Sequence, residues 1–158
     1  KAIQVNSVYG ASKFIVEKLI GQYSSINKST TYHIIRCGNV FGSTNSVISK
    51  WKFLLQNKKV IDVTDLDATR YFCSVDEVVD IMLHFCMYVK KSTIASLNLK
   101  SVSLKILLDA MQIKYGKAKK INIIGRQVGE NKHEKLSEHG LSSNIANKYT
   151  INELLKFI

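Results

Sequence analysis

A tyrosine and a lysine lie four residues apart near the start of the sequence, as Tyr9 and Lys13. In an α-helix this spacing places both side chains on one face. An ammonium group beside a phenol stabilises the phenolate form, so that the pair can take up and release a proton. The same spacing also occurs by chance in many helices, where the lysine is solvated beside a half-buried tyrosine. The pair alone therefore leaves two interpretations open, proton transfer and an ordinary helix surface.

The sequence around this pair alternates between helical and extended patterns. Residues 8–26 form the longest helical pattern, with Ala11, Ile15, Leu19 and Tyr23 one turn apart on a single stripe. Further helices are predicted at residues 46–56, 78–89, 104–115 and 152–158, and extended segments at 31–36, 60–63, 70–73, 94–99 and 120–124. Alternation of this kind favours an α/β fold with parallel strand pairing.

The order of the predicted elements leaves a parallel sheet incomplete. The central strands of such a sheet need neighbours on both sides and helices on both faces, yet this sequence begins with a long helix and one strand. Either the preceding strands exist elsewhere, or the chain carries an unpaired sheet edge and an uncovered apolar face. Because the first residue is Lys1 and not methionine, we interpret the chain as one whose beginning has been cut away.

Length and composition indicate one globular domain. The chain has 158 residues, 46% hydrophobic and 22% charged, and no apolar run approaches the ~18 residues of a membrane span. Its net charge of +11 suggests an anionic partner, but 20 of its 23 basic residues are lysines, scattered along the chain and densest between residues 114 and 120. Base and phosphate recognition usually relies on arginine. We expect no nucleic-acid function, which stays a minor alternative, and attribute much of the charge to AT-rich coding.

The three cysteines, Cys37, Cys73 and Cys86, are far apart and include no C-x-x-C pair. An odd number at these spacings argues against a disulfide framework or a zinc cluster. We therefore predict that they are small core side chains, that there is no metal site, and that the compartment is a reducing cytoplasm.

Five segments of the sequence resemble, in the same order, motifs of one enzyme family. They are residues 1–13 (KAIQVNSVYGASK), 36–43 (RCGNVFGS), 46–48 (SVI), 63–72 (VTDLDATRYF) and 129–134 (GENKHE). Together they resemble the extended short-chain dehydrogenase/reductases, and within these the UDP-N-acetylglucosamine 4,6-dehydratases of capsular and other surface-polysaccharide biosynthesis. The resemblance extends over about residues 1–134 and corresponds to the C-terminal portion of such enzymes.

The resemblance implies NADP-dependent dehydration of a UDP-sugar. In the family, a tyrosine of a Y-x-x-x-K motif acts as base while hydride passes from sugar C4 to NADP, and a lysine–aspartate pair then helps to eliminate water across C5 and C6. By position, Tyr9 corresponds to the base at C4, and Lys13 to the lysine that tunes it and holds the nicotinamide ribose. Lys1 corresponds to the lysine that acts at C5. Tyr9 and Lys13 are thereby also the implied cofactor-binding residues.

Four further residues are implied to bind the substrate. Asn39 and Arg70 correspond to positions that line the UDP-sugar pocket, where the planar guanidinium suits a phosphate. Glu130 and His133 correspond to a late segment near the nucleotide.

The sequence departs from the family pattern in three places. The aspartate of the lysine–aspartate pair would stand immediately before Lys1. The G-x-x-G-x-x-G turn that binds the cofactor pyrophosphate lies at the family's N-terminus and has no equivalent in residues 1–158. Residues 127–130 read Q-V-G-E where the family reads R-P-G-E, so the phosphate-binding arginine is either displaced to Arg126 or lost.

We therefore predict the C-terminal part of an extended Rossmann-type α/β fold, in which residues 1–45 end the dinucleotide-binding domain and residues 46–158 form a small substrate-binding α/β subdomain. The predicted function is that of a nucleotide-sugar 4,6-dehydratase, inactive as this chain alone. A non-catalytic remnant or nucleotide-sugar binding module, and a nucleotide-sugar epimerase, are the alternatives. The implied partners are a UDP-sugar and either a second copy, because the long first helix pairs subunits in this superfamily, or a complementing N-terminal half.

Overall fold

The computed structural model describes all 158 residues, which form five helices and seven strands. In chain order these are α1 (Val8–Ile26), β1 (His33–Arg36), β2 (Asn39–Val40), α2 (Val47–Gln56), β3 (Val60–Val63), β4 (Thr69–Cys73), α3 (Val75–Tyr88), β5 (Thr93–Ser96), β6 (Ser101–Ser103), α4 (Leu104–Tyr115), β7 (Lys120–Ile123) and α5 (Ile151–Phe157). All helices and strands predicted from the sequence are present. The two additional strands, β2 and β6, have two and three residues and are too short to produce a recognisable alternation.

Each helix begins after a serine or threonine whose side-chain oxygen accepts a backbone N–H of the first turn. Ser7 accepts from the N–H of Gly10 at 3.1 Å and thereby fixes the start of α1. At α3, Ser74 and Glu77 form a capping box, in which the Glu77 carboxylate accepts from the Ser74 N–H at 2.7 Å. The helix expected at residues 78–89 therefore begins three residues earlier, at Val75.

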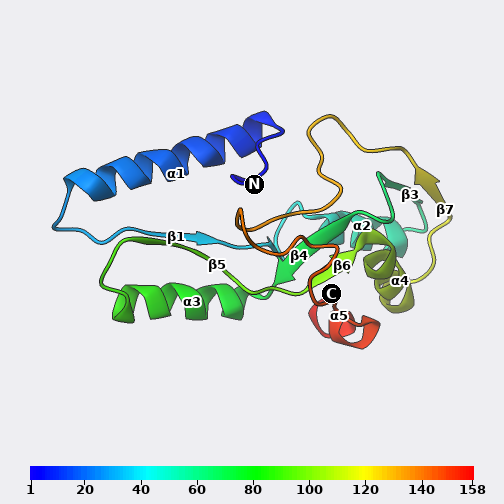
Figure 1. Ribbon diagram of the computed structural model, residues 1–158. Helices are drawn as coiled ribbons and strands as arrows, with labels where there is room; N and C mark the ends of the chain where they lie inside the picture. The colour runs from blue at the N-terminus through cyan, green and yellow to red at the C-terminus, as the bar shows by residue number, and fades with distance from the viewer.

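Strands β1 and β5 form a two-stranded parallel sheet that lies between α1 and α3 (Figure 1). Arg36 at the end of β1 donates two hydrogen bonds to Glu17 of α1. His33 at the start of β1 contacts Phe85 of α3, with ring centroids 5.4 Å apart. Because residues 33 and 36 point to opposite faces of the strand, the two helices cover opposite faces of the sheet.

The outer surfaces of this layered part are apolar and exposed. The stripe formed by Ile15, Leu19 and Tyr23 is solvent-exposed on α1, as are Met82 and Met87 on α3. In the two-stranded sheet, each strand also has one edge without a partner strand. An unpaired edge and an uncovered apolar face are therefore present in this structure.

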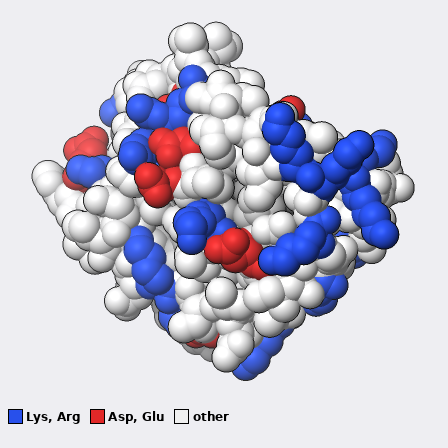
Figure 2. Space-filling view, turned by 90° about the vertical axis from the view of Figure 1, so that its right-hand side faces the viewer, with Lys and Arg blue, Asp and Glu red and all other residues white.

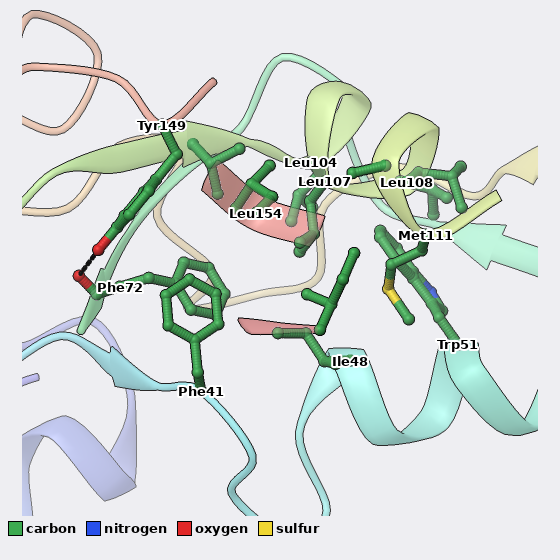
Figure 3. Packing of buried hydrophobic residues seen from close by; sticks show 14 of the residues in the cluster. Phe41, Ile48, Trp51, Phe72, Leu104, Leu107, Leu108, Met111, Tyr149 and Leu154 are labelled. Atoms are coloured by element: carbon green, nitrogen blue, oxygen red, sulfur yellow. Dashed lines mark hydrogen bonds between the residues drawn. The ribbon is translucent and has the colours of Figure 1, made fainter. Parts of the chain in front are cut away.

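The main hydrophobic core lies in the other part of the molecule, between α2, α4, α5 and the strands β3, β4 and β6. It contains 17 buried hydrophobic residues (Figure 3). Phe41 stacks on Phe72 with ring centroids 4.8 Å apart, and the Tyr149 hydroxyl donates to the Phe72 carbonyl oxygen at 3.4 Å. Leu107 and Met111 of α4 are fully buried in the cluster. Burial of this apolar surface is the dominant stabilising term, and it holds β2 and β4 in the positions from which they contribute to the site described below.

The expectation that all three cysteines are core residues is wrong for two of them. Cys73 on β4 is buried, whereas Cys37 and Cys86 are exposed. Cys37 lies in the link between β1 and β2, which borders a cavity, and Cys86 lies on a helix that has the small β1–β5 sheet on one side and solvent on the other. Burial raises the pKa of the Cys73 thiol to about 11.

We expect an alkylating reagent to modify Cys37 and Cys86 of the folded chain at neutral pH and to leave Cys73 unmodified. Only a thiolate reacts, and Cys73 is both inaccessible and protonated under these conditions. Peptide mass spectrometry after timed alkylation measures this, and the denatured chain, in which all three thiols should react, is the control. Modification of native Cys73 at the rate of Cys86 would contradict the packing around β4.

Candidate active site

The N-terminal turns of α1 bring Tyr9 and Lys13 together. The ammonium nitrogen of Lys13 lies 5.3 Å from the centroid of the Tyr9 ring, so the two side chains share one face of the helix. Tyr9 is 59% exposed. The start of α1 also lies close to the segment before it, because a Cβ at Gly10 would stand only 3.1 Å from the carbonyl oxygen of Lys1. This close approach places Lys1 beside the first turn of the helix.

A cavity of about 650 Å³ opens between the start of α1, the link from β1 to β2, and the segment of residues 129–136. Six of the seven site residues proposed from the sequence line it: Lys1, Tyr9, Lys13, Asn39, Arg70 and Glu130. Four separate regions of the chain contribute them. The fold therefore gathers into one space the residues that the sequence holds far apart.

Arg70 is largely held by the chain itself. Its Nη2 donates to the Glu130 carboxylate at 2.9 Å, and its Nη1 donates to the carbonyl oxygens of Thr69 and Lys132 at 2.9 and 3.0 Å. The arginine side chain is only 13% exposed. It therefore contributes positive charge to the cavity wall from a fixed position, with few donors left for a ligand.

Glu134 connects more of the site than any residue singled out from the sequence. Its carboxylate accepts from the backbone N–H of Tyr71 at 3.0 Å and from the Asn39 amide at 3.5 Å. It also forms ion pairs with the Lys1 ammonium at 3.3 Å and the Arg70 guanidinium at 3.8 Å. Sequence reasoning missed this role, and the signal that it offered was a carboxylate at the end of the matched segment 129–134.

A second carboxylate in the cavity wall was also missed. Glu17 accepts from Arg36 Nε at 2.9 Å and from Arg36 Nη2 at 2.6 Å, which is the two-pronged geometry favoured by arginine and carboxylate. The hydrogen bond to Glu17 raises the pKa of Arg36. Both side chains line the cavity, and their bridge fixes α1 against β1, one helical turn beyond Lys13.

His133 does not line the cavity. Its Nδ1 lies 2.8 Å from the Thr69 hydroxyl, which in turn contacts the buried Ser143 hydroxyl at 2.6 Å. Burial lowers the pKa of His133, and so do the positive charges of Lys132 and Lys148. The histidine is therefore neutral at neutral pH and packs behind the wall of the cavity.

Arg126 also lies away from the cavity lining. Its Nε is 3.5 Å from the Asp65 carboxylate, which Lys132 approaches at 3.9 Å. The arginine next to the altered Q-V-G-E segment is thus directed to a surface ion pair in this structure.

The segment of residues 129–135 closes the cavity by packing across the first residues of the chain. The Asn6 amide donates to the Asn131 side chain at 2.6 Å, and the N–H of Lys135 donates to the Gln4 side chain at 3.1 Å. Gly129 has a φ of +84°, and a Cβ there would stand 2.5 Å from the carbonyl oxygen of Asn6. Only glycine fits this crossing without a shift of the backbone.

We expect Gly129→Ala to lower the free energy of unfolding by about 2–3 kcal/mol, because the backbone clash adds to the ~1 kcal/mol or more that positive φ costs a residue with a Cβ. Gly125→Ala is the matched control, since Gly125 has a φ of +79° but nothing within 4 Å of an added Cβ. Urea unfolding of both variants measures the difference. Equal losses of stability would show that the contact with Asn6 does not constrain the crossing.

No group of three or more His, Cys, Asp or Glu side chains in residues 1–158 is arranged to hold a metal ion. None of the five helices combines the length and the hydropathy that crossing a membrane requires.

Comparison with known proteins places the chain in a family. The model of the family described as "Polysaccharide biosynthesis protein" matches residues 1–154. The chain belongs to this family. The resemblance to capsular-polysaccharide and 4,6-dehydratase proteins noted from the sequence is thereby confirmed.

The curated proteins to which this chain is similar include two kinds of nucleotide-sugar enzyme. A UDP-N-acetylglucosamine 4,6-dehydratase (inverting) of Campylobacter jejuni is 29% identical over 100% of this chain and 48% of its own length. A UDP-glucose 4-epimerase of Rickettsia bellii is 28% identical over 96% of this chain and 46% of its own length. The chain thus spans about half the length of these relatives.

Solved structures confirm the α/β, Rossmann-type fold class of this family member. The X-ray structure of Pen from Bacillus thuringiensis is 26% identical with a TM-score of 0.83, and the match covers 98% of this chain and 58% of that one. The UDP-glucose 4-epimerase of Thermus thermophilus in complex with NAD has a TM-score of 0.70 at 15% identity, over 97% of this chain and 55% of that one. At 15% identity, the similarity to the Thermus thermophilus structure shows a shared fold only.

Proposed function

We propose that this chain is the sugar-facing part of a nucleotide-sugar 4,6-dehydratase of polysaccharide biosynthesis, with UDP-N-acetylglucosamine as its substrate. One observation carries the proposal: Tyr9, Lys13 and Lys1 border the same cavity of about 650 Å³ as Asn39 and Arg70. That volume lies within the usual range for small-molecule sites. The catalytic groups near the start of α1 and the polar groups on the opposite wall of the cavity can then act on one ligand.

In the proposed reaction, the Tyr9 phenolate takes the proton of the sugar C4 hydroxyl. The Lys13 ammonium, 5.3 Å from the ring centroid, stabilises that phenolate electrostatically. General-base assistance of this kind contributes about 10²–10⁴-fold to a rate. The exposure of Tyr9 is consistent with a group that must meet a substrate.

Lys1 is proposed to act at sugar C5, where the 4-keto group acidifies the proton. In its neutral form the Lys1 amine would take that proton and return it to the leaving C6 hydroxyl, so that one water is released. The Glu134 carboxylate lies 3.3 Å from Lys1 Nζ and fixes its position, while the lysine side chain remains 55% exposed. A tethered but accessible lysine is suited to this step.

The charges of the wall suit a diphosphate. Five basic side chains, Lys1, Lys13, Arg36, Arg70 and Lys135, face three acidic ones, Glu17, Glu130 and Glu134. Each carboxylate is already paired within the wall, with Arg36, Arg70 or Lys1. Lys13 and Lys135 form no ion pair with a carboxylate, so the cavity retains a positive balance that attracts an anionic ligand.

The residues present fit one end of NADP. Tyr9 and Lys13 would hold the nicotinamide ribose, while residues 1–158 contain no glycine turn for the pyrophosphate. When bound, NADP would accept a hydride from sugar C4 and return it to C6. The chain's own contribution is to orient the sugar and move the protons at O4 and C5.

The proposal extends to organisation and partners. Residues 1–45 would end a dinucleotide-binding part and residues 46–158 would supply the substrate-binding part, with β5 returning to pair with β1. The exposed apolar surface of α1 would bind a second copy or a complementing nucleotide-binding half. We place the protein in the cytoplasm, in keeping with its three free thiols.

Protection of Cys37 from alkylation tests ligand binding in the cavity. Cys37 lines the cavity, whereas Cys86 of α3, which is also exposed, does not, so one chain carries both the probe and its control. We expect saturating UDP-N-acetylglucosamine, and UDP alone, to slow the alkylation of Cys37 several-fold and to leave that of Cys86 unchanged. Unchanged alkylation of both cysteines would overturn the assignment of the cavity.

A turnover assay distinguishes the candidate reactions. The chain is combined with the N-terminal half of the Campylobacter jejuni relative, NADP and the UDP-sugar, and products are separated by mass spectrometry. Loss of one water supports dehydration, and a correctly folded mixture that binds the sugar without converting it supports a binding module instead.

A 4-epimerase is the second candidate function, favoured by the relative of that name in Rickettsia bellii. Tyr9 and Lys13 would serve this reaction too, because it also begins with proton and hydride removal at C4. A product of unchanged mass, formed at a rate that Lys1→Met does not change, would support it, because epimerisation at C4 involves no reaction at C5.

A further inference from the structure

Six exposed lysines lie around the C-terminal halves of α2 and α4 and the starts of β3 and β7. They are Lys52, Lys58, Lys59, Lys117, Lys119 and Lys120, which together form the lysine face. These elements lie on the side of the molecule seen in Figure 2, where basic side chains predominate at the right and basic and acidic side chains alternate at the left. None of the six lysines lines the candidate active site.

Tertiary structure assembles the lysine face from two separate segments. The β3–β7 pairing sets Lys120 beside Val60, and the N–H of Lys119 donates to the carbonyl oxygen of Lys59 at 3.2 Å. Two of the lysines cover aromatic rings: Lys59 lies 4.9 Å from the centroid of Phe53, and Lys52 lies 5.2 Å from that of Tyr115. Phe53 and Val60 are themselves exposed. The face therefore combines positive charge with accessible apolar surface.

The positive charge of this face is not neutralised within the chain. None of the six lysines takes part in an ion pair. Residues 43–61 and 110–129 contain no aspartate or glutamate. The acidic residue nearest to these lysines in the sequence is Asp62 on β3, whose carboxylate accepts from the Asn122 amide at 3.0 Å. Folding thus concentrates like charges that repel one another, and an external anionic partner would relieve that repulsion.

We propose that the lysine face binds the anionic headgroups of a membrane surface. Lysine side chains lay their aliphatic stems on apolar surface and extend the ammonium groups to headgroup level, and a cluster of four to eight basic residues is the usual signature of such binding. A nucleic acid fits less well, because the face contains no arginine, the side chain on which base and phosphate recognition usually relies. The inference does not depend on the proposed function.

Vesicle co-sedimentation of the full 158-residue chain tests this surface. The vesicles consist of phosphatidylcholine with or without phosphatidylserine, at low and at physiological salt. We expect binding only with phosphatidylserine, weakened by salt. Each lysine at the surface contributes a factor of about five in affinity, so K117Q/K119Q/K120Q should bind about a hundredfold more weakly.

The matched control is K28Q/K90Q/K91Q, which removes the same charge from the two loops at the opposite end of the molecule (Figure 1). It should retain binding to phosphatidylserine vesicles within a few-fold. Equal weakening by both triple variants would overturn the proposal, because net charge alone would then explain the binding. Absence of binding to phosphatidylserine, or tighter binding to duplex DNA than to these vesicles at the same salt, would overturn it as well.

Discussion

Replacement of Tyr9 by phenylalanine should reduce the rate of UDP-N-acetylglucosamine dehydration by about 10²–10⁴-fold, the usual contribution of a positioned general base. The substitution removes only the phenolic oxygen and keeps the ring against which Lys13 lies. Binding of the UDP-sugar should therefore change little, so the loss should appear in kcat rather than in KM. The measurement is the turnover assay with the complementing nucleotide-binding half, accompanied by protection of Cys37.

Tyr88→Phe is the matched control for this prediction. Tyr88 lies on α3 and is 65% exposed, close to the 59% of Tyr9, and it neither lines the cavity nor belongs to the α1 surface proposed to bind a partner. Its replacement should leave the rate unchanged within about twofold, as for a surface substitution away from the site. If Tyr9→Phe retained the wild-type rate, the proton at sugar O4 would have another acceptor and the proposed role of Tyr9 would be wrong.

Replacement of Glu134 by alanine should lower the free energy of unfolding by about 3–5 kcal/mol, as expected when one partner of a largely buried charge network is removed. The Glu134 and Arg70 side chains are only 15% and 13% exposed. Without the carboxylate, Arg70 loses one of its two acidic partners and the N–H of Tyr71 loses its acceptor. Urea unfolding followed by circular dichroism measures the loss.

Glu134→Gln and Glu138→Ala refine this prediction. The glutamine keeps an oxygen for the Tyr71 N–H and removes the charge, so it should lose less stability than alanine does. Glu138 is exposed and forms no ion pair, and its replacement should change stability by no more than about 0.5 kcal/mol. A Glu134→Ala variant as stable as Glu138→Ala would show that the contacts of Glu134 are energetically unimportant.

The local elements of this fold could be predicted because their signals are local. The α4 helix was predicted with its observed bounds, since Ser103 caps its start and Gly116 follows its end. The strand β3 likewise has the predicted bounds, with buried and exposed residues in alternation. The capping box of Ser74 and Glu77 is visible in the sequence and is confirmed, but the apolar pattern predicts a helix start at residue 78, three residues after the observed start.

In the candidate site, too, the local contacts could be predicted and the long-range contacts could not. The spacing of Tyr9 and Lys13 within one helix predicts that they share a face, and the structure shows them there. Nothing local indicates that Glu134 would meet Lys1, Asn39 and Tyr71, because those contacts join residues far apart in the chain. The resemblance implies that His133, which immediately precedes Glu134, binds the substrate. In the structure His133 instead contacts Thr69 and lies behind the cavity wall.

By itself, the sequence determined the types and order of the main elements, the Tyr9–Lys13 pair and the resemblance to a polysaccharide biosynthesis family. The tertiary structure alone decided which residues surround the cavity, which carboxylates pair with its basic groups, and how two lysine-rich segments form one face. The reason is physical. Helix caps and side-chain periodicity depend on neighbours within a few residues, whereas strand pairing and ion pairs depend on how distant segments pack around the core.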